Sequence, residues 1–202
     1  PVVSRPSKIS VTDVQRLIRD PYAIYAKHVL RLRPMAPLQK VPDALIRGTV
    51  LHAVFEQFVK DVQADPDQLR RDRLEQISHD ILLEEVPWPS FRHVWQARIR
   101  RVSDWFVAQE AMRRVDAHPS AFELTGTGKI ERFGFTLTGK ADRIDLDGRG
   151  CALIYDYKTG TPPSKKVKQN FDKQLLIEAA MVEEGGFREV GAAHVAQAVY
   201  IG

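Results

Sequence analysis

Two aspartates and a lysine lie in the strand-like part of the sequence at a spacing that could build a hydrolytic metal site. Residues 135–146 and 152–158 alternate between apolar and polar side chains, which is typical of β-strands. If the intervening residues form a turn, the antiparallel register places Asp142 opposite Asp156. Directly opposed residues share one face of a sheet, with Cβ atoms about 4.5–5.5 Å apart. Because side chains alternate along a strand, Lys158 lies on the same face as Asp156.

This arrangement favours phosphodiester hydrolysis assisted by a divalent cation. Two opposed carboxylates destabilise a sheet unless a positive charge lies between them, and Mg²⁺ accepts carboxylate, water and phosphate oxygens as ligands. Such an ion can polarise a phosphate and lower the pKa of a bound water. The ammonium of Lys158 can position that water and stabilise the charge that develops on the phosphate.

The same residues also have a structural interpretation. Asp142 could form a surface salt bridge with Lys140 or Arg143, and Asp156 could form one with Lys158. However, the residues just before Asp156 are apolar, which indicates an interior strand that emerges at the end of a sheet. Functional sites often lie at such positions, so the pattern favours catalysis over salt bridging.

Periodicity and helix caps predict the elements that must position these groups. The first half of the chain has helical periodicity, with Ser10 and Asp20 as N-caps and Pro21 at a first helical position. After Pro119 the period changes to two, which predicts a β-meander. Helices are expected from Ser10, Asp20, Asp43, Asp65 and Ser90, with a loop at Pro34, Pro37 and Pro42; strands are expected over 122–130, 135–146 and 152–158, followed by a helix over 167–184 and a strand over 195–201.

The helix expected from Ser90 carries aromatic and basic residues. The helical spacing of its aromatic side chains indicates core packing, so we expect Trp88, Trp95 and Trp105 to be structural rather than base-stacking residues. Its basic residues fit a solvated face or a DNA track equally well. They are Arg92, Arg98, Arg100 and Arg101.

The composition indicates one soluble domain. With 202 residues, of which 44% are hydrophobic and 28% charged, the chain can bury a substantial core. Residues 1–118 are expected to be mainly helical and 119–202 to form a strand-rich core of the same domain. Lys and Arg outnumber Asp and Glu by 30 to 26, which suits a domain that meets phosphates. The chain lacks an initiator Met and ends on a strand-like pattern, so we expect a fragment of a longer protein.

Cysteine content and hydropathy exclude several classes of protein. The single cysteine, Cys151, excludes an internal disulfide framework and any all-cysteine metal site built from this chain alone. This content fits a reducing cytoplasm. No apolar run approaches the ~20 residues that span a bilayer, so we expect no membrane partner.

Four segments resemble, in order, the motifs of RecB-like nucleases within the PD-(D/E)XK superfamily. They are 47–52, 139–145, 156–160 and 174–176. The combination is more specific than any one motif, and the resemblance is strongest to the C-terminal nuclease domain of AddB, a subunit of the AddAB helicase–nuclease. It implies an α/β fold with the restriction-endonuclease-like αβββαβ core, to which this chain adds a helical N-terminal half.

The resemblance also implies roles for individual residues. His52, Asp142, Asp156 and the backbone carbonyl of Tyr157 are expected to surround the metal, and Lys158 and Gln174 complete the catalytic motif. The cofactor would be Mg²⁺, and an imidazole ligand would also admit Mn²⁺. Two further carboxylates are possible contributors outside the main set, Glu56 one helical turn from His52 and Glu123 on the first strand.

The implied activity is that of a DNA nuclease. The resemblance points to a deoxyribonuclease, an exonuclease acting on single-stranded DNA, that works with an AddA-like helicase–nuclease subunit in double-strand break repair and recombination. Lys165, Lys166 and Lys168 could hold the DNA backbone or form an ordinary soluble loop. The alternative is a catalytically silent DNA-binding or assembly module that keeps the fold. The intact set of two aspartates and a lysine favours the nuclease.

The sequence departs from this family in two places. Many AddB-type domains hold an iron–sulfur cluster with four cysteines, but the early cysteine position is Asp20 here and the terminal three are absent from these residues. Because Cys151 cannot replace four ligands, we expect no iron–sulfur cluster. The tyrosine that usually follows the glutamine motif is replaced by Glu178.

Overall fold

The computed structural model describes residues 4–35 and 41–202, so Pro37 of the expected loop lies outside the described residues. The helices are α1 (Val11–Arg19), α2 (Pro21–His28), α3 (Ala44–Ala64), α4 (Arg71–Glu85), α5 (Pro89–Asp116), α6 (Lys165–Asn170) and α7 (Gln174–Glu183), with short 3₁₀ turns at Pro66–Gln68 and Glu131–Phe133. The strands are β1 (Lys8–Ser10), β2 (Ala117–Ile130), β3 (Phe135–Asp147), β4 (Ala152–Tyr157) and β5 (Val195–Ile201).

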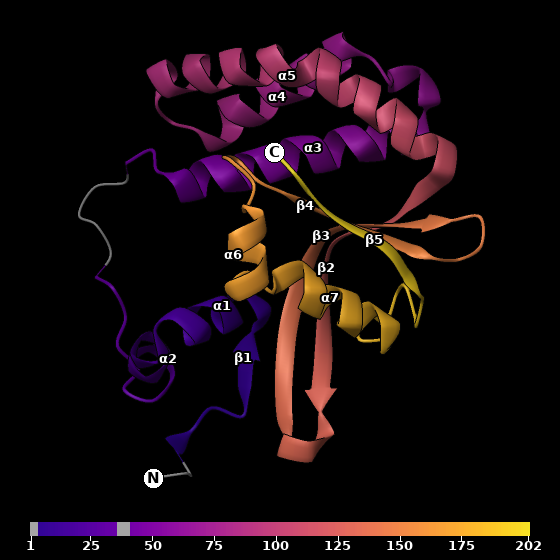
Figure 1. The fold of residues 1–202 in the computed structure, drawn as a ribbon. Coiled ribbons are helices and arrows are strands. Elements are labelled where there is room, and N and C mark those ends of the chain that lie inside the picture. The colour runs from indigo at the N-terminus through magenta and orange to yellow at the C-terminus, as the bar shows by residue number, and fades with distance from the viewer. Residues whose placement is uncertain (1–3, 36–40) are drawn as a thin grey trace.

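The expected order of helix, three strands, helix and strand is confirmed. Figure 1 shows α3, α4 and α5 together on one side of the sheet and α7 on the other.

Local capping explains where the early helices begin. The Ser10 hydroxyl accepts a hydrogen bond from the backbone N–H of Asp13, and the Asp20 carboxylate accepts one from Ala23. Pro21 occupies the first turn of α2, where its missing N–H costs nothing. These predicted caps are confirmed. Across residues 4–35 and 41–202, no helix combines the length and the apolar character needed to cross a bilayer.

The sheet has β3 at its centre. β2 pairs antiparallel with β3 along nearly its whole length, while β1 and β4 pair with different parts of β3, and β5 extends the sheet parallel to β4. The β3–β4 register runs from Leu146 opposite Ala152 to Arg143 opposite Tyr155, as the sequence predicts. β1 is an additional strand, too short for its three residues to show a periodic pattern.

The single helix expected over 167–184 is wrong, because the segment forms two helices, α6 and α7. The break lies at Asp172, which is buried and accepts hydrogen bonds from the Tyr200 hydroxyl at 2.8 Å and from the backbone N–H of Gln174 at 3.2 Å. A tyrosine on β5 thus stabilises the break, and no local pattern could reveal it. The break places Gln174 in the first turn of α7.

Two hydrophobic cores lie on opposite faces of the sheet. One contains the inward sides of α3, α4 and α5 with Tyr155 and Tyr157 of β4, and the other contains α7 with Ile154 of β4. Trp95 is buried as expected, with 7% exposure, and Trp88 packs against the same core. The core prediction is wrong for Trp105, whose side chain is 48% exposed.

A buried ion network ties α5 to the sheet. Arg143 is fully buried and lies 2.7 Å from a carboxylate oxygen of Glu110 and 2.6 Å from one of Asp145. Both acidic side chains are fully buried too. Burial opposes the charge on the Arg143 guanidinium, but the Asp145 hydrogen bond and the adjacent negative groups hold its pKa above its ordinary value. Arg143 and Asp145 belong to β3, and Arg143 directly follows Asp142 in the chain.

Candidate active site

The site begins at an irregularity in the β2–β3 ribbon. Ala121 and Leu124 both contact the α7-side core although an odd separation should place them on opposite faces, and Ala141 and Ile144 of β3 do the same. Between them, Glu123 has φ of 48°, a left-handed conformation that a residue with a side chain rarely adopts. Such strain costs about 1–3 kcal/mol and clusters at functional sites. The irregularity lies where Glu123 faces Asp142.

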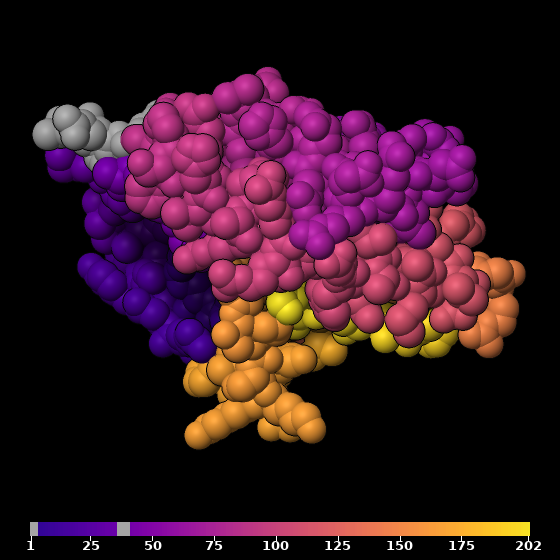
Figure 2. Space-filling view, turned by 90° about the horizontal axis from the view of Figure 1, so that it is seen from above, coloured from indigo at the N-terminus to yellow at the C-terminus, as the bar shows by residue number. Residues whose placement is uncertain are grey.

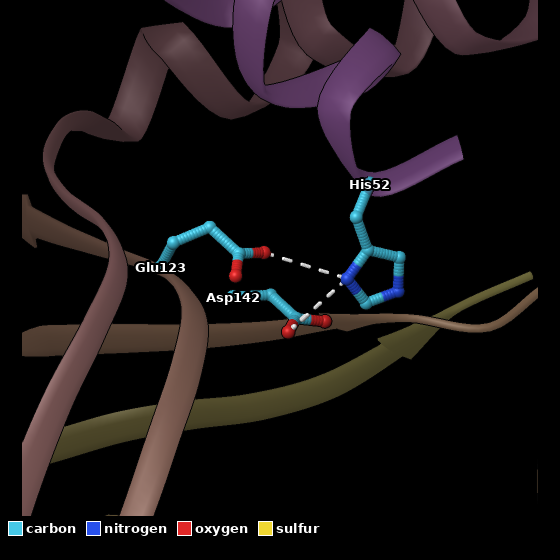
Figure 3. A group of neighbouring side chains, drawn as sticks. All are labelled: His52, Glu123 and Asp142. Atoms are coloured by element: carbon cyan, nitrogen blue, oxygen red, sulfur yellow. Dashed lines mark ion pairs between the residues drawn. The ribbon is translucent and has the colours of Figure 1, made fainter. Parts of the chain in front are cut away.

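His52 of α3 reaches this irregularity from the face of the sheet that α3, α4 and α5 cover, opposite α7. Its Nδ1 atom lies 3.4 Å from Asp142 Oδ1 and 3.5 Å from Glu123 Oε1. Figure 3 shows the imidazole and the two carboxylates directed toward one another from three separate elements. One ligand atom from each residue can be chosen so that all lie within 4.8 Å of one another. This spacing would allow the three side chains to share one cation.

Backbone atoms of Tyr157 hold both His52 and Asp142 in place. The Tyr157 carbonyl oxygen lies 2.8 Å from His52 Nε2, and the Tyr157 backbone N–H donates to Asp142 Oδ2 at 2.8 Å. With a proton on Nε2 donated to this carbonyl, Nδ1 is the ring atom that faces the carboxylates, and it would bind a cation once its own proton has left. A backbone carbonyl bound to the remote nitrogen is the usual way in which a metal-binding histidine is oriented.

The local charges hold a proton on His52 when no cation is bound. Burial disfavours the charged imidazole, but the hydrogen bond and negative charge of Asp142, with smaller effects from the Tyr157 carbonyl and Glu123, raise the pKa of His52 to about 9. The protein thus concentrates negative charge at one point and uses an imidazolium to balance it. A divalent cation could take over that balance.

A second set of residues lies around Asp156 at the end of β4. Asp156 is 3% exposed, its Oδ1 accepts a 2.6 Å hydrogen bond from the Gln174 amide, and its Oδ2 lies 2.6 Å from Lys158 Nζ. The Lys158 ammonium also donates to Gln174 Oε1 at 3.4 Å. Gln174 therefore holds the aspartate and the lysine together, and its own amide lies 3.2 Å from a carboxylate oxygen of Glu178.

Burial raises the pKa of the Asp156 carboxyl although both of its oxygens have close partners. Desolvation raises the pKa of Asp156 to about 6, the Lys158 ammonium opposes this rise, and the charge of Asp142 adds to it. Among residues 4–35 and 41–202, the buried Oδ2 atom has Lys158 Nζ at 2.6 Å but no donor that is aligned for a hydrogen bond. A buried acceptor of this kind is normally satisfied by a donor, a water or an ion.

Comparison with known proteins decides the family. The family model of the PD-(D/E)XK nuclease superfamily matches residues 8–202. The chain belongs to this superfamily. Its membership confirms the predicted family and agrees with the mixed α/β fold and the five-stranded sheet described above.

Several longer proteins are similar to this superfamily member. An uncharacterized protein of Rickettsia bellii is 32% identical over 185 residues, which cover 90% of this chain and 22% of the relative. One of Rickettsia conorii is 32% identical over 192 residues, covering 91% and 23%. An ATP-dependent helicase/deoxyribonuclease subunit of Clostridium botulinum is 25% identical over 210 residues, covering 86% and 17%. The chain spans about a fifth of the length of these relatives.

The predicted site residues of this PD-(D/E)XK domain fall into two adjoining sets. His52 and Asp142 lie together with Glu123, while Asp156, Lys158 and Gln174 form the second set. The peptide of Tyr157 joins the sets, because its N–H and carbonyl contact the first and its neighbours in the chain belong to the second.

The salt-bridge interpretation applies to only one of its pairs. Asp156 does pair with Lys158, but Lys140 pairs with Glu123, and Arg143 is engaged in its own buried network. Asp142 therefore directs one carboxylate oxygen to His52 rather than to a neighbouring basic side chain. This leaves Asp142 in the imidazole–carboxylate set and not in a surface pair.

Two carboxylates have a more central place than the sequence suggests. Glu123 is outside the main set expected from the sequence, yet it joins His52 and Asp142. The sequence held a signal for this position, because a hairpin register that starts with Ile130 opposite Phe135 places Glu123 opposite Asp142. Its left-handed backbone carries no local signal. Glu178 is 2% exposed beside Gln174. Glu56, in contrast, pairs with Lys60 at 2.5 Å.

The donor set fits a divalent metal ion. An imidazole nitrogen and two carboxylates lie within 4.8 Å of one another, and a buried oxygen of Asp156 has no aligned donor in the part of the chain that the structure describes. Together they form a mixed nitrogen and oxygen environment. Oxygen ligands suit Mg²⁺, and an imidazole suits Mn²⁺ and the later transition metals. The side chains that would hold such an ion are His52, Asp142 and Glu123, with Asp156 at the adjoining edge.

Proposed function

We propose that this domain is a deoxyribonuclease that hydrolyses phosphodiester bonds with Mg²⁺, or with Mn²⁺ in its place. The observation that carries the proposal is the meeting of an imidazole–carboxylate set and an Asp–Lys–Gln set at one end of the sheet in a member of the PD-(D/E)XK nuclease superfamily. His52, Asp142 and Asp156 are the proposed ligands, with the Tyr157 carbonyl adjoining. To these we add Glu123.

The chain's own residues have defined parts in this reaction. A bound divalent ion would polarise the phosphate and lower the pKa of a water beside it. Lys158 then positions the attacking water and offsets the negative charge that develops on the phosphate. Gln174 contacts both Lys158 and Asp156, so it keeps the ammonium beside the carboxylate rather than in solvent.

The name of one relative supports a proposal for the substrate and the cellular context. A protein named for helicase and deoxyribonuclease activity is similar to this chain over most of the chain's length, so we propose that the domain cuts single-stranded DNA delivered by an AddA-like helicase partner, as an exonuclease. Its place would be the cytoplasm, in double-strand break repair and recombination. We further propose that residues 1–202 act as one nuclease domain of a longer protein.

A basic segment beside the site suits a nucleic-acid substrate. Figure 2 shows the orange region around α6 projecting from the body of the molecule. It carries Lys165, Lys166 and Lys168. Cations at such a projection can contact the DNA backbone without reading its sequence.

The test is a cleavage assay on the 202-residue chain. End-labelled single-stranded DNA is incubated with Mg²⁺, with Mn²⁺ or with EDTA, and the products are resolved by length. We expect cutting in both metals and none in EDTA. Lys158→Ala should abolish it and leave the thermal unfolding midpoint nearly unchanged, because the side chain is 32% exposed and the buried Asp156 carboxyl, whose pKa is already raised to about 6, can take up a proton when its cation is removed.

The matched control is Lys129→Ala, which removes an exposed lysine of β2 away from the site and should leave cutting unchanged. Unimpaired cutting by Lys158→Ala would refute the mechanism. DNA binding without cutting in either metal would instead favour the silent binding module.

A further inference from the structure

An apolar cavity of about 380 Å³ adjoins the proposed active site. It lies between α3, α5 and the ends of β4 and β5, and its walls include Phe55, Trp95 and Trp105. Lys158, Thr159 and Gly202 close one side. Figure 2 shows the yellow end of the chain beside the pink helix α5, at the edge of this region. The volume falls in the range of pockets that hold small ligands.

Trp105 lines the cavity, but core packing does not account for its position. Its neighbour on α5, Phe106, is 1% exposed and stacks on Phe55 with ring centroids 4.2 Å apart, and Trp95 is 7% exposed. Trp105 keeps 48% of its surface exposed while lining the cavity. An exposed indole at the mouth of an apolar cavity offers a flat surface on which another ring can stack.

The cavity also carries cations that lack a protein counter-charge. Arg47 and Arg98 line it, and within residues 4–35 and 41–202 neither lies within ion-pair distance of a carboxylate. The Nε atom of Arg47 is buried and has no hydrogen-bond partner among those residues. Other arginines of α4 and α5 do form ion pairs, such as Arg71 with Glu75 and Arg100 with the same residue. A ligand for this cavity therefore combines a planar apolar group with anionic groups.

The cavity shares a wall residue, Lys158, with the proposed active site. Lys158 lines it and also forms the 2.6 Å ion pair with Asp156. Leu51, another wall residue, precedes His52 on α3. A group bound in the cavity would therefore lie next to a phosphate held at Lys158.

We propose that the cavity receives a nucleobase of the DNA strand next to the scissile phosphate. The base stacks on Trp105, while Arg47 and Arg98 contact the phosphates on either side of it. The inference rests on the proposed nuclease function and adds a subsite for single-stranded DNA to it, since a base paired in a duplex could not enter a cavity of this kind. Stacking on an indole tolerates all four bases, so the subsite would read single-strandedness rather than sequence.

The test measures DNA binding without cleavage. Fluorescein-labelled oligothymidylate is titrated with the 202-residue chain in EDTA, and anisotropy gives the Kd. Trp105→Ala should weaken binding on the order of 10-fold, and Trp105→Phe should restore most of it because a ring remains. Phe133→Ala is the matched control, because Phe133 is a 70% exposed ring at the turn between β2 and β3 and does not line the cavity.

A second ligand separates base stacking from a structural effect. For an oligonucleotide made of abasic sugar phosphates, the loss caused by Trp105→Ala should disappear. Arg98→Ala should weaken binding of both oligonucleotides, whereas Arg101→Ala, an exposed arginine of α5 outside the cavity, should not.

Three outcomes would overturn the inference. Equal Kd values for wild type, Trp105→Ala and Phe133→Ala would overturn it. Metal-dependent cutting that needs Lys158 would, in that case, leave the proposed function intact. An equal loss on the abasic ligand would assign Trp105 to packing or to a protein partner. A wild-type chain that neither binds nor cuts DNA would remove the proposed function, and this subsite with it.

Discussion

Glu178→Gln should stabilise the protein increasingly as the pH rises. Glu178 is 2% exposed, and burial, with a further contribution from the charge of Asp156, raises its pKa from 4.5 to about 8. The unfolded chain ionises this carboxyl above about pH 4.5, whereas the folded protein resists ionisation until about pH 8. Its contribution to stability is therefore fully present below pH 4.5 and is lost as the pH rises through about 8.

The size of the effect follows from the interval between these two pKa values. At about 1.4 kcal/mol for each pH unit, the interval from 4.5 to about 8 sets a ceiling of roughly 5 kcal/mol. Relaxation and water entry reduce this, so we expect about 2–4 kcal/mol in favour of Glu178→Gln at pH 9. The glutamine carbonyl can still accept the Gln174 hydrogen bond now made by Glu178 at 3.2 Å.

The assay is urea unfolding followed by circular dichroism at pH 5, 7 and 9 in EDTA, because a bound cation would offset the negative charge and hide the effect. Glu184→Gln, at the exposed end of the same helix, is the control and should change stability by less than about 0.5 kcal/mol at each pH. If the free energies of unfolding of wild type and Glu178→Gln differ by the same amount at all three pH values, Glu178 is not held protonated by burial.

Two further predictions concern the buried charges and the cation. Arg143→Met should lower the free energy of unfolding by about 3–5 kcal/mol, since it leaves Glu110 and Asp145 buried without their partner. Urea unfolding measures this loss. A loss no greater than that caused by Arg149→Met, at an exposed arginine, would contradict the prediction. Calorimetric Mn²⁺ affinity should rise by up to about tenfold per pH unit from pH 7 to 9, because a cation must displace the proton from His52, whose pKa is about 9. His52→Gln should flatten that dependence, and an equal slope in both proteins would exclude His52 as a ligand.

The sequence alone was sufficient for the features that local chemistry controls. The caps at Ser10 and Asp20 depend on side chains that bond their own backbone a few residues on, and the β3–β4 register depends on a short turn and the two-residue period. These interactions span few residues, so they can be derived by inspection. The same arithmetic predicts Asp142 opposite Asp156, one step beyond the observed pairing of Arg143 with Tyr155.

Only the tertiary structure decided how the remaining site residues meet. His52 contacts the Tyr157 carbonyl across 105 positions, and the Asp172–Tyr200 hydrogen bond stabilises the helix break before Gln174 across 28 positions. Glu123 adopts a left-handed backbone that its residue type does not favour, and Trp105 stays exposed despite helical spacing that predicts burial. Periodicity reports which face of an element is apolar, but not which distant segment will cover it. Contacts between distant segments form only when the two cores close around the sheet, so these features could be seen only in the folded chain.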